Sequence, residues 1–391
     1  MIGYPTLVRQ LLILLILAAP ASARRSSVTP EMDKLVTAGL DGIYRMDFDA
    51  ADAAARAAMA LDPGYPQAYL GAAATDFIRY VYGPAPTDDR LLKSFEKKVG
   101  VAISVSESWL KAHPNDPDGL LVLGTGYGIS ARLALERREY LKGWRYGSRA
   151  MKYIRAAIKA DPEIYDADLG LGMFDYYVDT IPRFAGWLAK IMLGGDRARG
   201  LRELRLAAEK GHFGRTAAQL ILVEIETQDV FGARDTPDAV RLMAGIRAEY
   251  PESSMLHSAQ VVSLYENGNY VEGLREAKEY LARVESGRYD AVNLPAAHAL
   301  NGTLLWALDR KDEALAEFRA GGADPKPRSD WTILNRARAG QVLDALGRRD
   351  EALAAYRSAY ADDRWEMRAY IKPCLSSPCV GKKYPGPFAP H

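Results

Sequence analysis

Small, apolar and polar residues between positions 337 and 359 follow a pattern that predicts two short helices joined by a tight turn. Gly340 lies midway along the first predicted helix, and Gly347 ends it. Ala352 and Tyr356 fall on one face of the second helix at helical spacing. Facing small residues let the two helices approach closely, and the ring of Tyr356 fills the adjoining groove. A single hairpin of this kind leaves an apolar face uncovered, so the pattern predicts a stack of hairpins.

The same order of small, acidic and aromatic residues recurs 38 positions upstream, in Gly302, Asp312, Glu313, Ala314 and Phe318. Segments 266–277 and 45–66 carry it again, and the second of these ends in an Asp-Pro pair. In these segments the chain resembles the tetratricopeptide repeat family. The resemblance implies an all-α solenoid of helical hairpins, wound as a right-handed superhelix whose concave face binds a protein or peptide. It also implies an interaction surface in place of a catalytic centre.

The small residue that opens each second helix can be followed through the chain as Ala51, Ala102, Ala150, Gly200, Ala239, Gly273, Ala314 and Ala352. The spacings between these positions are 51, 48, 50, 39, 34, 41 and 38 residues. They predict about eight hairpins in a solenoid over residues 24–361. The hairpins are longer and degenerate to about residue 211 and more regular over 212–361.

Residues 1–23 have the form of a secretory signal peptide. Arg9 precedes an apolar run, and Ala21 and Ala23 give the small-x-small pattern of a cleavage site. The run is short for a membrane span, although an uncleaved anchor is the alternative. We expect cleavage after Ala23 and a periplasmic or secreted bacterial protein.

The composition is that of a folded helical protein without a strong electrostatic field. Hydrophobic residues make up 48% of the chain, and the formal net charge is +1. Such a balance selects neither nucleic acid nor an anionic membrane. We therefore expect a protein or peptide partner, no nucleic acid and no cofactor.

Arginine and aromatic residues are densest between positions 137 and 153. A helix with this mixture could line a ligand groove, offering charge-assisted hydrogen bonds and ring stacking to an acidic peptide or an anionic glycan. The other interpretation is an ordinary amphipathic helix with its rings in the core and its arginines in solvent. The candidate groove residues are Arg138, Tyr140, Trp144, Arg145 and Arg149.

Segment 169–211 weakly resembles the eukaryotic inclusion-body-clearance proteins, which are built of the same repeats. Within it, Pro182 begins a predicted apolar helix over 182–193. This helix could be a lid over the groove, a cap on the core or a peripheral membrane contact. Its apolar side consists of Phe184, Trp187, Leu188, Ile191 and Met192.

The tail over 362–391 is rich in proline and glycine and contains the only two cysteines, Cys374 and Cys379. In an exported chain two cysteines at this spacing most simply form a disulfide. A metal site is the other interpretation, but two thiolates and the distant His391 do not complete a tetrahedral set.

No catalytic constellation emerges from the sequence. The five histidines are scattered, without a metal-binding or catalytic spacing. Asp175 and Asp179 lie one helical turn apart and could act as paired acids, but we expect them to be solvated or capping groups. The sequence thus favours a non-catalytic binding scaffold of the bacterial envelope. The alternatives are a membrane-associated accessory subunit that uses helix 182–193, and an enzyme with a site in the groove.

Overall fold

We describe the protein from a computed structural model over residues 27–82, 89–136, 139–180, 195–229, 231–326, 329–363 and 367–379. Across these ranges it forms 17 α-helices and one short 3-10 helix, and no strand. The predicted all-α class is therefore confirmed. Among these helices, none combines the length and the apolar composition that a membrane crossing requires. The predicted signal (1–23) lies outside the described residues.

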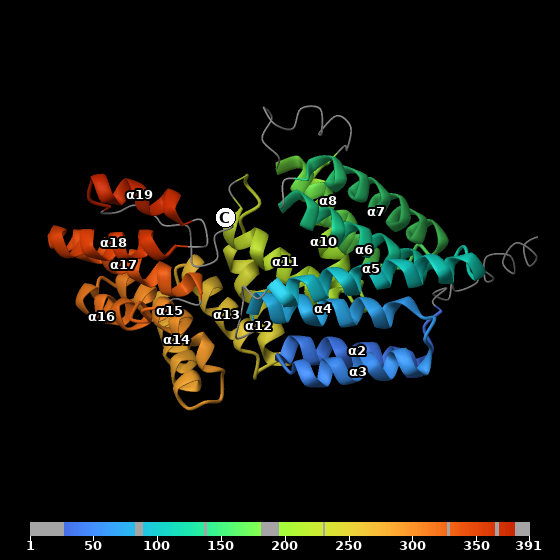
Figure 1. Cartoon of the computed structure of the whole chain (residues 1–391), viewed down its shortest axis with the longest axis horizontal. Coiled ribbons are helices and arrows are strands. Elements are labelled where there is room, and N and C mark those ends of the chain that lie inside the picture. The colour runs from blue at the N-terminus through green and yellow to red at the C-terminus, as the bar shows by residue number, and fades with distance from the viewer. Residues whose placement is uncertain are drawn as a thin grey trace, which may run out of the picture.

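Sixteen of these helices pair into eight consecutive hairpins that form a helical-hairpin solenoid (Figure 1). The first four pair α2 (Pro30–Arg45) with α3 (Phe48–Leu61), α4 (Pro66–Tyr82) with α5 (Asp89–Ala112), α6 (Pro117–Glu136) with α7 (Tyr140–Ala160), and α8 (Asp166–Thr180) with α10 (Arg197–Lys210). The next four pair α11 (Arg215–Gln228) with α12 (Thr236–Glu249), α13 (Ser254–Glu266) with α14 (Tyr270–Glu285), α15 (Leu294–Ala307) with α16 (Lys311–Gly321), and α17 (Asp330–Ala345) with α18 (Arg349–Asp362). Helices α5, α6 and α7 have 24, 20 and 21 residues. The 3-10 helix η1 (Ala291–Asn293) precedes α15, and α19 (Arg368–Ser376) follows the last hairpin.

The tracked small residues are the points where paired helices meet. All eight are buried in the structure: Ala51, Ala102, Ala150, Gly200, Ala239, Gly273, Ala314 and Ala352. Helices α8 and α10 cross closely. A Cβ atom built on Gly172 would lie 2.7 Å from the carbonyl oxygen of Gly200, and one on Gly200 would lie 2.7 Å from that of Gly172. Two glycines at the crossing therefore allow backbone-to-backbone packing that no larger pair would permit.

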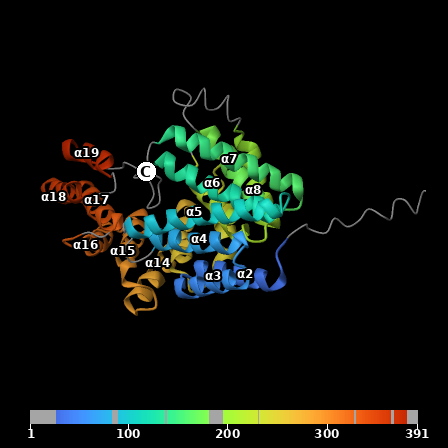
Figure 2. The ribbon, with the colours of Figure 1, turned by 45° about the vertical axis from the view of Figure 1, so that its right-hand side comes forward.

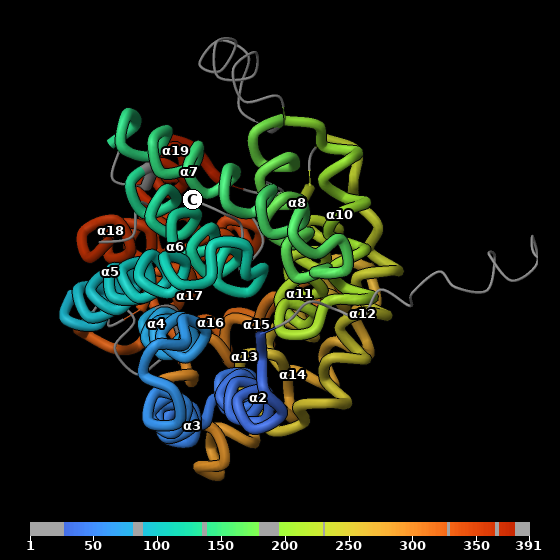
Figure 3. Tube along the Cα trace, turned by 90° about the vertical axis from the view of Figure 1, so that its right-hand side faces the viewer, coloured from blue at the N-terminus to red at the C-terminus, as the bar shows by residue number. Residues whose placement is uncertain are grey.

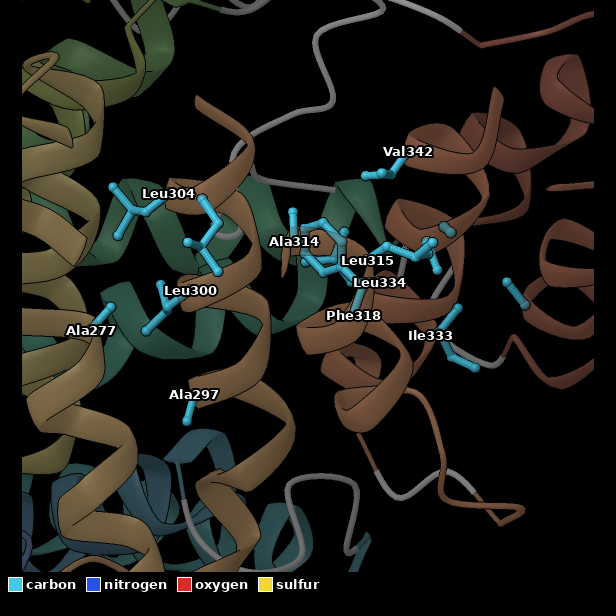
Figure 4. Packing of buried hydrophobic residues seen from close by; sticks show 14 of the residues in the cluster. Ala277, Ala297, Leu300, Leu304, Ala314, Leu315, Phe318, Ile333, Leu334 and Val342 are labelled. Atoms are coloured by element: carbon cyan, nitrogen blue, oxygen red, sulfur yellow. The ribbon is translucent and has the colours of Figure 1, made fainter. Parts of the chain in front are cut away.

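Large rings fill the grooves beside the small residues in the last two hairpins. A Cβ on Gly340 would lie 2.6 Å from the ring of Tyr356, and one on Gly302 would lie 2.6 Å from the ring of Phe318. Both rings are fully buried. Figure 4 shows Phe318 between the apolar side chains of α15 and those of α17. The predicted packing of small residue against ring is thus present in both repeats.

The first hairpin packs against the fifth and sixth hairpins, so the coil closes on itself after about one turn (Figure 3). Tyr44 of α2 contacts Tyr250, which follows α12, with ring centroids 5.4 Å apart. Met243 and Leu256, from α12 and α13, belong to the same buried cluster. The turn that leads from α2 into α3 is made by Met46 in a left-handed conformation, with φ 64°.

Helix α19 covers the exposed end of the stack beyond α18 (Figure 1 and Figure 2). Within the Pro/Gly-rich tail that the sequence indicated over 362–391, residues Arg368–Ser376 are helical. Ile371 and Cys374 are buried against the last hairpin. A disulfide joins Cys374 to Cys379, whose Cα atoms lie 5.2 Å apart. The stack therefore ends in a covered face.

Candidate functional site

The first helices of the middle hairpins line the inside of the coil, and the second helices lie outside them. Viewed along the long axis, α6, α8 and α11 lie nearer the centre than α7, α10 and α12 (Figure 3). Exposed residues of these first helices therefore lie on the inner side of the coil, and exposed residues of the second helices lie on its outer side. The side of the coil on which each sequence-predicted residue lies follows from this arrangement.

Four of the five predicted groove residues lie on α7, the outer helix of the third hairpin. Tyr140 and Trp144 expose 66% and 44% of their surface, and Arg145 and Arg149 are also exposed. The opposite face of α7, which includes Ala150, packs on α6. The four residues therefore do not line the inner surface where a concave groove was expected. The fifth, Arg138, lies outside the described residues.

The predicted lid or anchor residues also lie outside the described residues: Phe184, Trp187, Leu188, Ile191 and Met192. The helix that follows them is described. Its N-cap is Asp196, whose Oδ1 accepts a hydrogen bond from the backbone N–H of Arg199 at 2.9 Å. The side chain of Asp196 therefore satisfies one of the unpaired backbone N–H groups at the start of α10.

Asp175 is neither solvated nor a capping group, contrary to the sequence interpretation. Only 4% of it is exposed, and it forms a two-pronged ion pair with Arg199 of α10, in which Nη2 lies 2.8 Å from Oδ1. Glu203 lies close by, and burial followed by the charge of Asp175 raises its pKa to about 7. Asp175 and Asp179 do not act as a pair, because Asp179 instead faces Arg197 at 4.0 Å. The cluster around Asp175 holds α8 to α10.

Three polar side chains from successive inner helices meet on the inside of the coil: Arg132 of α6, Tyr177 of α8 and Glu224 of α11. The Tyr177 hydroxyl donates to Glu224 Oε1 at 3.4 Å, and Arg132 is near enough to act electrostatically on both groups. Arg132 and Glu224 are exposed, and Tyr177 exposes 38% of its surface. We call these three residues the inner polar cluster.

The inner polar cluster is solvent-accessible yet closely surrounded by protein. Burial raises the pKa of the Tyr177 phenol and of the Glu224 carboxyl, and Arg132 acts in the opposite direction by favouring their ionised forms. Side chains that are both exposed and partly desolvated are typical of a concave surface. Such a surface can offer a guanidinium donor, a carboxylate acceptor and a phenol to one bound chain.

A neighbouring network fixes the position of Tyr177. The adjacent Tyr176 is buried and donates a hydrogen bond to Asp229, which follows α11. Asp229 Oδ2 also accepts from the backbone N–H groups of Phe231 and Ala233, at 2.8 and 2.6 Å. Tyr176 therefore anchors α8 to the start of the α11–α12 connection, and Tyr177 is held beside α11.

One surface pocket lies away from the inner polar cluster, between the first hairpin and α4. It is lined by Met46, Asp47, Phe48, Asp49, Asp52 and Arg79. Arg79 is paired with Asp52 at 2.9 Å and lies over the Phe48 ring. Asp47 caps α3. Arg79, Asp52 and Asp47 thus already have structural partners, and we assign no ligand to the pocket.

Within the described ranges, no group of three or more histidine, cysteine, aspartate or glutamate residues is arranged to hold a metal ion. The inner polar cluster could not be predicted from a sequence motif, because its three residues lie on three separate hairpins. Helix register is the signal that would have found Tyr177. It follows Gly172 by five residues, which places it about 140° around the helix from the face that meets α10.

Comparison with known protein families found no family model that matches the chain, and comparison with curated proteins found no similar sequence. Similar solved structures exist. A tetratricopeptide repeat protein from Parabacteroides merdae is 14% identical, with 89% of this chain and 98% of that chain covered and a TM-score of 0.32. Yeast Tom70 is 10% identical, with 86% of each chain covered and a TM-score of 0.41. A human IFIT1 dimer with m7Gppp-AAAA is 12% identical, with 86% and 95% covered and a TM-score of 0.34.

The fold assignment rests on the eight hairpins of this chain. Their helix pairing and their packing of small residues against rings make it a tetratricopeptide-like solenoid.

Proposed function

We propose that this protein is a non-catalytic scaffold that binds an extended segment of a partner protein on the inside of its coil. The observation that carries the proposal is the inner polar cluster, in which Arg132, Tyr177 and Glu224 converge from three successive hairpins. An extended peptide exposes backbone N–H and C=O groups along its length. Glu224 can accept a hydrogen bond from a peptide N–H group, and Arg132 can donate one to a peptide C=O group. The cluster therefore matches the hydrogen-bonding groups of a peptide backbone.

Preorganisation also supports this function. The contact between the first hairpin and the fifth and sixth closes the coil before any ligand arrives. Tyr176 and Asp229 fix the helix that carries Tyr177. A surface fixed in this way loses little conformational entropy on binding, which favours affinity for a flexible peptide.

A photo-crosslinking residue placed at Tyr177 tests this proposal. We expect it to capture a defined peptide segment of one partner protein in intact cells, identifiable by mass spectrometry. The matched control is the same residue at Val271, which exposes 76% of its surface on the outer helix α14. Capture of the same set of proteins from both positions would contradict binding on the inner surface.

A second experiment tests the chemistry of the cluster. Peptides selected from a random library on the wild-type protein should bind Glu224→Arg at least tenfold more weakly, because the variant places two like charges beside the peptide. Glu224 is exposed, so the substitution leaves the helix packing intact. Selected peptides that bind Glu224→Arg and wild type equally would rule out the inner polar cluster as their site.

The envelope location belongs to the same proposal and rests on residues 1–23 alone. Fractionation of bacteria that express the chain should recover it outside the cytoplasm, with an N-terminus at Arg24. A full-length cytoplasmic product that still begins at Met1 would contradict the envelope location. It would not affect the proposed peptide-binding surface.

A further inference from the structure

Helix α7 carries a concentrated positive charge that the near-neutral composition of the chain conceals. It contains six basic residues and no acidic residue. All six are exposed: Lys142, Arg145, Arg149, Lys152, Arg155 and Lys159. Their spacing of three or four residues places them along one side of the helix. The opposite side, which includes Met151 and Ile154, is buried against α6.

This basic stripe is largely unneutralised. Lys142 pairs with Glu139 at 2.8 Å, and Arg149 lies over the ring of Tyr127. No carboxylate of the described residues pairs with Arg145, Lys152, Arg155 or Lys159. Elsewhere on the outer surface arginines are commonly paired, as Arg348 is with Glu351 at 2.7 Å. Unpaired like charges on a rigid helix repel one another and are stabilised when an anionic surface approaches.

Large apolar side chains lie at the N-terminal end of the same stripe. Tyr140, Leu141 and Trp144 expose 66%, 65% and 44% of their surface. A tyrosine, a leucine and a tryptophan exposed within five residues suit the boundary between lipid headgroups and acyl chains, where rings with one polar end are favoured. Basic residues beside such a group supply the electrostatic part of interfacial binding.

We propose that the exposed face of α7 binds the surface of an anionic phospholipid membrane. Lys152, Arg155 and their neighbours contact the headgroups, and Leu141 and Trp144 enter the interface. The charge alone would also suit a nucleic acid. The exposed aliphatic chain of Leu141 favours lipid, because phosphate backbones offer nothing to an aliphatic side chain. This surface lies on the outside of the coil, so a membrane bound there leaves the inner polar cluster accessible (Figure 3).

Co-sedimentation with vesicles tests the proposal. The full chain should bind vesicles of mixed phosphatidylcholine and phosphatidylglycerol, and it should bind phosphatidylcholine vesicles much more weakly. Replacing Arg145, Lys152 and Arg155 by glutamine should weaken binding to the mixed vesicles roughly a hundredfold, from about 1 kcal/mol for each basic residue near the surface. Arg145→Lys with Arg155→Lys keeps the charge and should bind as wild type does.

The matched control removes the same charge from three other outer helices. Arg56, Lys278 and Arg357 are exposed on α3, α14 and α18. Changing all three to glutamine should leave vesicle binding within about twofold of wild type, because only a local stripe concentrates charge at the membrane. All variants share residues 1–26 and 181–194. Any lipid contact made by these residues therefore contributes equally to every variant and cannot cause a difference between them.

The outcomes separate the alternatives. Equal binding by the α7 variant and the control variant overturns the proposal, as does equal binding to neutral and anionic vesicles. Binding of poly(U) RNA that depends on Arg145, Lys152 and Arg155, without vesicle binding, makes the face a nucleic-acid surface and also overturns it. Leu141→Ser should weaken vesicle binding several-fold without affecting binding to RNA, and no effect on vesicles would exclude interfacial insertion.

Discussion

The hydroxyl of Tyr250 donates a hydrogen bond to Asp41 Oδ1 at 3.0 Å, joining residues that are 209 positions apart in the sequence. Asp41 lies on α2, and Tyr250 follows α12. Beside this bond the ring of Tyr250 packs on Tyr44. These contacts seal the first hairpin to the fifth and sixth. In an open solenoid each hairpin contacts only its neighbours, so this closure sets the dimensions of the inner surface.

Tyr250→Ala should detach the first hairpin, because it removes both the hydrogen bond and a buried ring. We expect a loss of about 3–5 kcal/mol from local stability, and a larger radius of gyration in small-angle scattering. Tyr250→Phe keeps the ring, so it should cost about 1 kcal/mol and leave the dimensions unchanged. An unchanged radius for the alanine variant would show that other contacts suffice to close the coil.

Gly340→Ala should destabilise the last hairpin by about 1–3 kcal/mol, measured by the urea midpoint of far-UV circular dichroism. The new Cβ would lie 2.6 Å from the ring of Tyr356, which is fully buried. Gly245→Ala is the matched control. Nothing lies within 4 Å of its Cβ position on α12, so helix propensity should stabilise this variant by up to about 1 kcal/mol. Equal shifts for the two variants would refute the packing role of Gly340.

The repeat could be predicted from the sequence because its determinants are local. Ala314 and Ala352 recur at a fixed offset from the rings of Phe318 and Tyr356, and the structure buries all four. By contrast, the contact of Asp41 with Tyr250 leaves no local pattern, because the two residues belong to units that meet only when the coil completes a turn.

The candidate site was harder to predict because composition does not fix register. Trp144 precedes the buried Ala150 by six residues, which turns it about 120° away from the packed face. The aromatic content of α7 suggested a groove, whereas its register points the ring outward. The ion pair of Asp175 with Arg199 was missed for another reason: its two members lie on different helices, 24 positions apart.

Glu226 should make the protein less stable as the pH rises from about 4.5 to 7. It is fully buried on α11, and Arg205 Nη2 lies 3.3 Å from its Oε1. Burial, followed by the charge of Asp238, raises its pKa to about 7. Between these pH values the unfolded chain has lost the proton that the folded state keeps, so deprotonation favours unfolding.

Glu226→Gln removes this titration. The difference in unfolding free energy between wild type and the variant should change by about 3 kcal/mol between pH 4.5 and 7.5, in the direction that favours the variant at high pH. Glu203, whose pKa is also raised to about 7, remains in both proteins and cancels in the comparison. A difference that stays constant across this range would mean that Glu226 titrates normally.

Asp344 should hold the C-terminal helix and its disulfide to the solenoid. Its carboxylate accepts hydrogen bonds from the Tyr356 hydroxyl at 2.9 Å and from the backbone N–H of Cys379 at 2.8 Å. It also pairs with Arg349 at 2.9 Å, and Arg349 in turn donates to the carbonyl of Cys374 at 2.8 Å. Because Asp344 is buried, Asp344→Ala leaves several of these groups without a partner and should cost about 3–5 kcal/mol.

Detachment of α19 would expose the two buried sulfurs, so dithiothreitol should reduce the disulfide much faster in the variant. The control for stability replaces both cysteines by alanine, which opens the short loop but keeps the Asp344 contacts. This variant should lose only about 2 kcal/mol of unfolding free energy, less than Asp344→Ala loses. If the disulfide of Asp344→Ala is reduced at the wild-type rate, α19 is held by the apolar contacts of Ile371 and its neighbours rather than by the Asp344 carboxylate.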